Sequence, residues 1–169
     1  MEVKNPLILT VRLDETSQQF FNKMRIKHFP PERNLLDAHL TLFHQLPDTD
    51  ETLEIITNSN RDFFKMQVTK LINLGAGVAY KIDSQELELL RQNLKKAFID
   101  QIIPQDQHGF RGHITIQNKT TPDEAKSLIA QLSAQFEPFG ITAIGLDLWE
   151  YLGGPWKHRR YVPFTYLDK

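Results

Sequence analysis

HLTL at residues 39–42 and HITI at residues 113–116 repeat one pattern of histidine, aliphatic residue, threonine and aliphatic residue. Alternation of polar and apolar residues predicts β-strands, because successive side chains of a strand point to opposite faces. The aliphatic residues of each motif would anchor the strand in the core, while its histidine and threonine face the other side. Two such strands related by an approximate two-fold axis would line one cleft with two imidazoles and two hydroxyls.

The segments around the two motifs follow a common order of strand, helix, motif strand, helix and strand. Histidines of the two motifs lie 74 residues apart and the flanking elements keep a similar offset, which is typical of an internal duplication. The pattern predicts an α+β fold in one domain, residues 1–169, with two pseudo-symmetric lobes at approximately 1–75 and 76–169. The predicted elements are strand 7–13, helix 15–28, strand 38–44, helix 50–63, strand 64–75, strand 78–82, a helix capped by Ser84, a loop at 104–112, strand 113–117, a helix from Pro122 to about Gln135 that starts with a Thr121/Glu124 capping box, and a hairpin of 140–152 and 156–167.

Composition excludes several classes of protein. With 169 residues, 40% of them hydrophobic, the chain is long enough for one substantial core. Its 20 basic and 21 acidic residues give no overall positive field, so long duplex nucleic acid is not an expected partner. It has no cysteine, which excludes disulfides, a thiolate zinc site and a thiol nucleophile. The apolar run at 6–11 is too short for a membrane span or a secretory signal, so we expect a cytoplasmic protein without a membrane partner.

Paired histidines and threonines suit chemistry at a phosphodiester. A proton must leave the attacking oxygen and another must reach the departing oxygen, and histidine, with an ordinary pKa near ~6.5, serves either purpose near neutral pH. We therefore predict that His39 and His113 are catalytic. The hydroxyls of Thr41 and Thr115 would donate to the non-bridging oxygens as charge builds on them. No metal or other cofactor is needed for such a site.

The sequence also resembles a known family, the 2H phosphoesterase superfamily, which includes the 2′-5′ RNA ligase and cyclic phosphodiesterase group. Its signature is a pair of histidine, hydrophobic, threonine or serine, hydrophobic motifs, and both motifs here match at every position. The strings HLTLFHQLP, FRGHITIQNK and LGGPWKHRRYVPF look like the bacterial branch. The resemblance implies a bilobal fold in which two antiparallel sheets line a central cleft, with helices on the outside. It also implies metal-free hydrolysis of 2′,3′-cyclic phosphates or 2′-5′ bonds, or reversible 2′-5′ joining, on a nucleotide or RNA end.

Three residues near the motifs are further candidates. Arg111 has the strand parity of His113 and would bind phosphate through its guanidinium, unless it is an ordinary surface arginine. Phe43 shares parity with His39 and would stack on a base, or else belongs to the core. His44 has the opposite parity, which favours a structural or hydrogen-bonding role.

The C-terminal hairpin mixes aromatic and basic residues. WKHRRY at 156–161 would contact phosphates and bases, or would be a solvated sheet edge, which we favour. Trp149, Tyr151 and Trp156 are expected to pack against one another across the hairpin.

Two alternatives to catalysis remain open. In the first, the chain is a non-catalytic protein of the same fold that binds an RNA end or a nucleotide without turning it over. In the second, His39 and His113 bind zinc together with a carboxylate. The zinc site lacks metal-ligand spacing such as His-x-x-x-His. Near-neutral charge and internal symmetry make a monomer sufficient, and the sequence leaves open which histidine is the acid.

Overall fold

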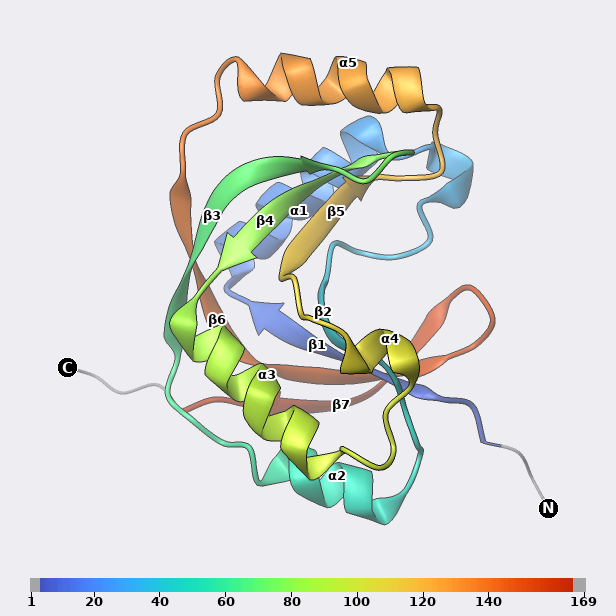
Figure 1. Ribbon diagram of the computed structural model, residues 1–169, viewed down its shortest axis with the longest axis vertical. Helices are drawn as coiled ribbons and strands as arrows, with labels where there is room; N and C mark the ends of the chain where they lie inside the picture. The colour runs from blue at the N-terminus through green and yellow to red at the C-terminus, as the bar shows by residue number, and fades with distance from the viewer. Residues whose placement is uncertain (1–3, 166–169) are drawn as a thin grey trace.

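A computed structural model describes residues 4–165, in which strands and helices follow the predicted order (Figure 1). The α+β prediction is confirmed. The elements are β1 (Leu7–Leu13), α1 (Glu15–His28), the short 3₁₀ helix η1 (Pro31–Arg33), β2 (Leu40–Leu46), α2 (Asp50–Thr57), β3 (Phe64–Asn73), β4 (Val78–Asp83), α3 (Gln85–Ala97), α4 (Pro104–Gln107), β5 (His113–Gln117), α5 (Pro122–Ser133), β6 (Phe139–Tyr151) and β7 (Trp156–Pro163).

The seven strands within residues 4–165 belong to one antiparallel sheet, with the order β2-β1-β6-β3-β4-β5 and with β7 also paired to β6. The prediction of two separate sheets is therefore wrong. The reason is the length of β6, whose 13 residues pair with β3 near the start of the strand and with β1 and β7 further along. Ala143 lies opposite both Phe64 and Leu13, at the point where the sheet changes partners.

Elements of the two chain halves interleave. Helix α1, from the first half, packs against β5, while β1 pairs with β6 from the second half. Neither part of the sheet is therefore built from one half of the chain alone, divided near residue 75. The arrangement of one domain with two pseudo-symmetric lobes stays a prediction. In Figure 1, β3, β4 and β5 lie with α1 and α5 in the upper part, and α2 and α3 cover the lower part.

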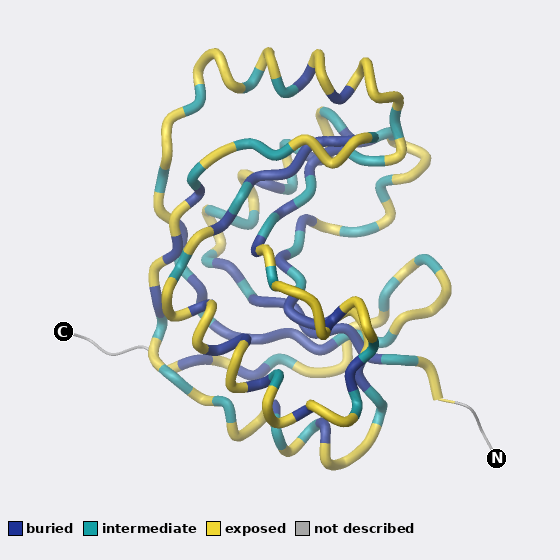
Figure 2. Tube along the Cα trace, viewed as in Figure 1, coloured by how far each residue is buried: buried dark blue, intermediate teal, exposed yellow. Residues whose placement is uncertain are grey.

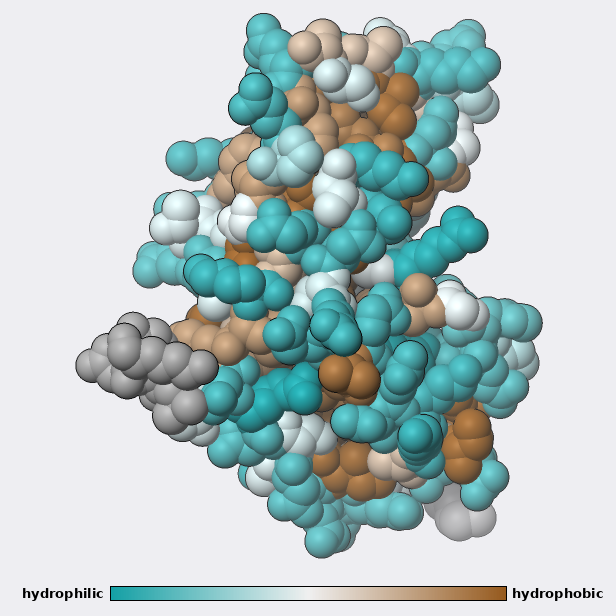
Figure 3. Space-filling view, turned by 60° about the vertical axis from the view of Figure 1, so that its left-hand side comes forward, coloured by the Kyte–Doolittle hydropathy of each residue, from teal (hydrophilic) through white to brown (hydrophobic). Residues whose placement is uncertain are grey.

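One hydrophobic cluster runs through the molecule along the strands. Figure 2 shows buried residues along the strands and exposed residues on the outer turns of α3 and α5. This pattern follows from amphipathic sequences, since Leu87, Leu90 and Leu94 form the buried stripe of α3. On the face seen in Figure 3, hydrophobic residues occur in separate patches among hydrophilic ones.

Most element ends agree with the sequence. Ser84 caps α3, and Thr121 and Glu124 form the predicted capping box of α5. Helix α2 ends at Thr57 rather than at 63, because the run from Asn58 to Asn60 favours a turn. Residues 104–107 form the short helix α4, which the loop prediction missed although Pro104 is a favourable first helical residue.

The predicted end of the C-terminal hairpin at 167 lies outside the described residues. Within residues 4–165, no helix is long and apolar enough to cross a membrane.

Candidate active site

The two motif histidines are held in the same way. His39, immediately before β2, donates from Nδ1 to the carbonyl oxygen of Asp37 at 2.8 Å, and His113, the first residue of β5, donates from Nδ1 to the carbonyl oxygen of Arg111 at 2.8 Å. A carbonyl oxygen can only accept, so each ring carries its proton on Nδ1. Nε2 of each ring can then accept a substrate proton when the imidazole is neutral, or donate one when it is protonated.

Strand β2 has a bulge at the last residue of its motif. Thr41 pairs with Thr10 of β1. The next pair joins Phe43 to Leu9, so Leu42 is an extra residue in the ladder. A bulge interrupts the alternation of faces, and Leu42 and Phe43 are both buried.

This bulge overturns the predicted base-stacking role of Phe43. Its ring is 0% exposed and packs against Phe98, with centroids 5.8 Å apart. No base can reach it in this position. The predicted role required side chains to alternate without a break from His39 to Phe43, and the bulge at Leu42 interrupts this alternation.

Strand β5 has its bulge at the equivalent place. Thr115 pairs with Ala79 of β4, and the next pair joins Gln117 to Val78, which leaves Ile116 extra. Ile116 and Gln117 are both buried, as Leu42 and Phe43 are in β2. The two motifs therefore share their local backbone geometry as well as their sequence.

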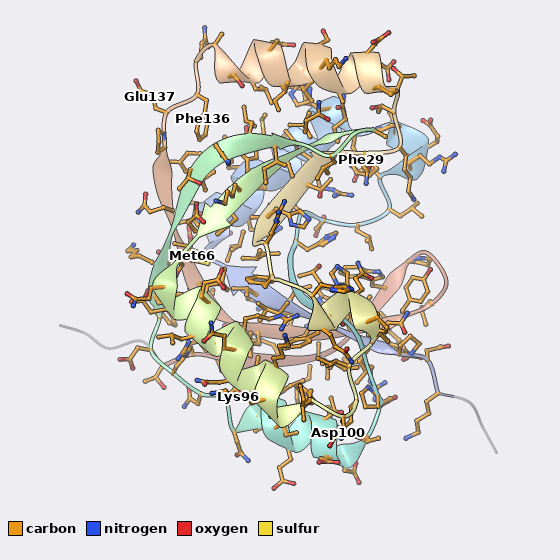
Figure 4. All side chains as sticks on the ribbon, in the orientation of Figure 1. Phe29, Met66, Lys96, Asp100, Phe136 and Glu137 are labelled. Carbon is orange, nitrogen blue, oxygen red and sulfur yellow. The ribbon has the colours of Figure 1, made fainter. Side chains whose placement is uncertain are left out.

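Buried arginines support both motif strands from the helices. Arg25 of α1 donates from Nη1 to the carbonyl of Thr115 at 3.1 Å, and Arg91 of α3 donates from Nε to the carbonyl of Leu42 at 2.8 Å. Each guanidinium also lies over a phenylalanine ring: Arg25 is 4.2 Å from the ring centre of Phe29, which is labelled in Figure 4 beside β5. Neither arginine is among the predicted site residues, because a helical arginine carries no local sign of a partner on a distant strand.

Arg25 also links the two motifs to each other. Its Nε donates to Asn34 Oδ1 at 3.1 Å, in the segment that leads to His39. One side chain therefore contacts β5 and the approach to β2. Strands β2 and β5 themselves are in contact.

The environment of His39 favours its neutral form. Burial lowers the pKa of His39 to about 4; the hydrogen bond to the Asp37 carbonyl opposes this shift, and the neighbouring Arg25, His113 and His44 side chains add to it.

The remaining predicted site residues are placed as follows. Thr41 and Thr115 are half-buried. Arg111 is exposed, and its backbone carbonyl accepts the hydrogen bond from His113 Nδ1. Their roles toward phosphate stay predictions.

His44 has the hydrogen-bonding role that the sequence favoured. Its Nδ1 lies 2.9 Å from Asp106 Oδ1, and its backbone N–H donates to the same carboxylate. Asp106 also accepts from the N–H of Gln45. This buried carboxylate of α4 thus accepts hydrogen bonds from backbone N–H groups of β2 beyond the bulge.

The C-terminal hairpin reaches the site through Trp156. Trp156 packs against His39, with ring centroids 4.6 Å apart, and against Trp149 at 6.0 Å. Packing of Trp149 on Trp156 was predicted, whereas the contact with His39 was not. The basic residues of 156–161 behave as an edge strand: Arg159, for example, pairs with Asp48 at 2.9 Å.

Among the described residues, no group of three or more histidine, cysteine, aspartate or glutamate side chains is placed to hold a metal ion. The zinc alternative thus gains no support from the geometry. Metal independence itself stays a prediction.

Comparison with known proteins places this arrangement in a family. A search of curated protein sequences finds no significant match. Among solved structures, the chain is similar to TT0787 of Thermus thermophilus (TM-score 0.67, 15% identity, covering 94% of this chain and 97% of that one) and to E. coli LigT complexed with 3′-AMP (TM-score 0.62, 16% identity, covering 96% and 99%). It is also similar to a protein described as a phosphoesterase (TM-score 0.64, 15% identity, covering 96% and 99%).

These likenesses show a shared fold. The sequence itself matches the family profile of the 2′-5′ RNA ligase superfamily over residues 13–155, a range that contains both motifs and most of the chain. The chain therefore belongs to the 2′-5′ RNA ligase superfamily of 2H phosphoesterases.

Proposed function

We propose that the chain is a metal-independent phosphoesterase that hydrolyses 2′,3′-cyclic phosphates or 2′-5′ phosphodiester bonds of nucleotides or RNA ends. The same chemistry in reverse would join RNA ends. The observation that carries the proposal is the matched placement of His39 and His113, each with Nδ1 bound to the carbonyl two residues earlier and Nε2 left to act. E. coli LigT, of similar fold, has been seen with 3′-AMP, ATP, NADP+ and phosphate, which supports a nucleotide substrate.

His39 is the general base in the proposed hydrolysis. A pKa of about 4 keeps its ring neutral at pH 7, so Nε2 accepts the proton of the attacking water. As water oxygen bonds to phosphorus, the bond from phosphorus to one ribose oxygen breaks and His113 gives that oxygen a proton. Solvent then takes the proton from His39 and returns one to His113. The hydroxyls of Thr41 and Thr115 donate to the non-bridging oxygens throughout.

The first test is turnover of a nucleoside 2′,3′-cyclic phosphate. We expect release of a 2′- or 3′-monophosphate that continues in EDTA, because no step passes through a metal. The product is identified by chromatography against both isomers. Tight binding with no product after long incubation would instead support the non-catalytic alternative, and loss of activity in EDTA that zinc restores would support the zinc site.

The pH dependence tests the assignment of His39. A base must be unprotonated, so kcat/KM should hold as pH falls from 7 to about 5 and drop only through about pH 4, the pKa of His39. Activity is measured across this range, with far-UV circular dichroism at each pH to exclude acid unfolding. An acidic limb near the ordinary histidine pKa of ~6.5 would contradict the assignment.

A further inference from the structure

A cavity of about 670 Å³ lies beside His39. The first turns of α1 and the segment before β2 form its sides, and β1, β6 and the start of β7 form its floor. Such a volume is within the range of small-molecule sites and exceeds what one phosphate needs. The residues of the floor and wall that matter here are Thr10, Arg12, Asp147, Trp149 and Trp156.

Aromatic rings line the part of the cavity next to the proposed base. Trp156 lies 4.6 Å from His39 and 6.0 Å from Trp149, measured between ring centroids, and both indoles are half-buried. A half-buried indole keeps part of its surface open to the cavity. A group bound at His39 Nε2 would therefore have a flat apolar surface directly beside it.

Polar groups of the floor are already partnered within the protein. Trp149 donates from Nε1 to Thr10 Oγ1 at 2.9 Å. Arg12 makes two bonds to Asp147, at 3.0 and 2.7 Å, and His158 Nε2 lies 2.8 Å from the same carboxylate. These hydrogen bonds fix the side chains of the floor. They leave few polar groups of the floor available to form hydrogen bonds with a ligand.

Resting on the proposed function, we infer that this cavity is a subsite for the nucleobase of the substrate, which stacks on Trp156 while its phosphate lies at His39. Every nucleobase has a π-face, and stacking is tolerant of base identity. Because the floor's polar groups are occupied, the subsite distinguishes nucleosides from base-free phosphodiesters but accepts purines and pyrimidines alike. This assigns to Trp156 the contact that the sequence suggested for Phe43.

The kinetic test compares a nucleoside 2′,3′-cyclic phosphate with glycerol 1,2-cyclic phosphate, which has no base. Trp156→Ala should reduce the ratio of their kcat/KM values about 10- to 100-fold, and Trp156→Phe should keep most of it. Leu152→Ala is the matched control, since Leu152 is an exposed apolar residue of the same hairpin and lies in the turn rather than opposite Trp156. An equal loss on both substrates would mean that Trp156 acts only through His39 and would overturn the subsite, as would an unchanged ratio.

A binding test separates the subsite from catalysis. Trp149 and Trp156 are the chain's two tryptophans, so in a Trp149→Phe variant all tryptophan fluorescence comes from Trp156. Adenosine and uridine 3′-monophosphates should both quench it, with dissociation constants within about tenfold of each other, since stacking is sequence-tolerant. Inorganic phosphate should quench much less.

Quenching needs no turnover, so it would support the subsite even if the proposed phosphoesterase activity were not found. Absence of quenching by either nucleotide, or equal quenching by phosphate, would overturn the subsite even in an active enzyme. A strong preference for one base would overturn the tolerance that we infer from the occupied floor groups.

Discussion

Replacing either motif histidine with alanine should lower kcat/KM on a nucleoside 2′,3′-cyclic phosphate by about 10² to 10⁴, the usual contribution of one general acid or base. His39→Ala removes the acceptor of the water proton, and His113→Ala removes the donor to the departing oxygen. Both side chains are half-buried at the start of their strands, so the fold should survive either change. Rates are measured under single-substrate conditions with product identification.

His108→Ala is the matched control for this pair, because His108 is exposed and lies outside both motifs. It should keep wild-type activity. Far-UV circular dichroism checks that all three variants are folded. If either motif variant kept full activity while folded, two-histidine catalysis would be excluded for that histidine.

The double variant His39→Ala/His113→Ala adds information that the single variants lack. Groups that act as one unit show strongly non-additive losses. The double variant should therefore be little slower than the slower single variant. Losses that multiply would instead indicate two independent contributions, for example one histidine in binding and one in chemistry.

How much of the site can be predicted from sequence depends on how local each feature is. The position of His113 at the start of β5 and of His39 just before β2 follows from four-residue patterns. The start of α5 follows from Thr121 and Glu124, which interact within one helical turn. All of these are local. Their prediction needs no knowledge of which strands become neighbours.

Features that depend on pairing partners could not be predicted in this way. The extra residues Leu42 and Ile116 are extra only relative to β1 and β4, and nothing in HLTLF or HITIQ alone specifies a bulge. Likewise, Trp156 contacts His39 because β7 pairs with β6, far along the chain from β2. The single continuous sheet could not be predicted for the same reason. Only the pairing of β6 with β3 at its start and with β1 and β7 further along shows that β6 joins the two parts of the sheet.

The bulge at the end of the first motif connects the stability of the fold to the site, and substitutions of Phe43 measure this connection. Phe43→Ala should lower the free energy of unfolding by about 3–5 kcal/mol, the usual cost of truncating a fully buried phenylalanine. The ring also lies 4.0 Å from the guanidinium of Arg91, which bonds to the carbonyl of Leu42, so the cavity left by the ring would loosen the support of the bulge. Urea unfolding followed by circular dichroism gives the free energy.

Phe43→Leu keeps an apolar side chain at this position and should recover most of the stability, which makes it the variant for kinetics. If Phe43 acts through packing alone, Phe43→Leu should change kcat/KM for nucleoside and base-free cyclic phosphates by the same factor, since the ring meets neither substrate. A loss of kcat/KM on the nucleoside substrate alone would indicate that the base contacts Phe43. Such a contact would require the strand to open at Leu42. Suppose that Phe43→Leu changes kcat/KM for both substrates equally, while Trp156→Ala lowers kcat/KM for the nucleoside substrate alone. Phe43 would then support the motif strand through packing, and Trp156 would contact the base.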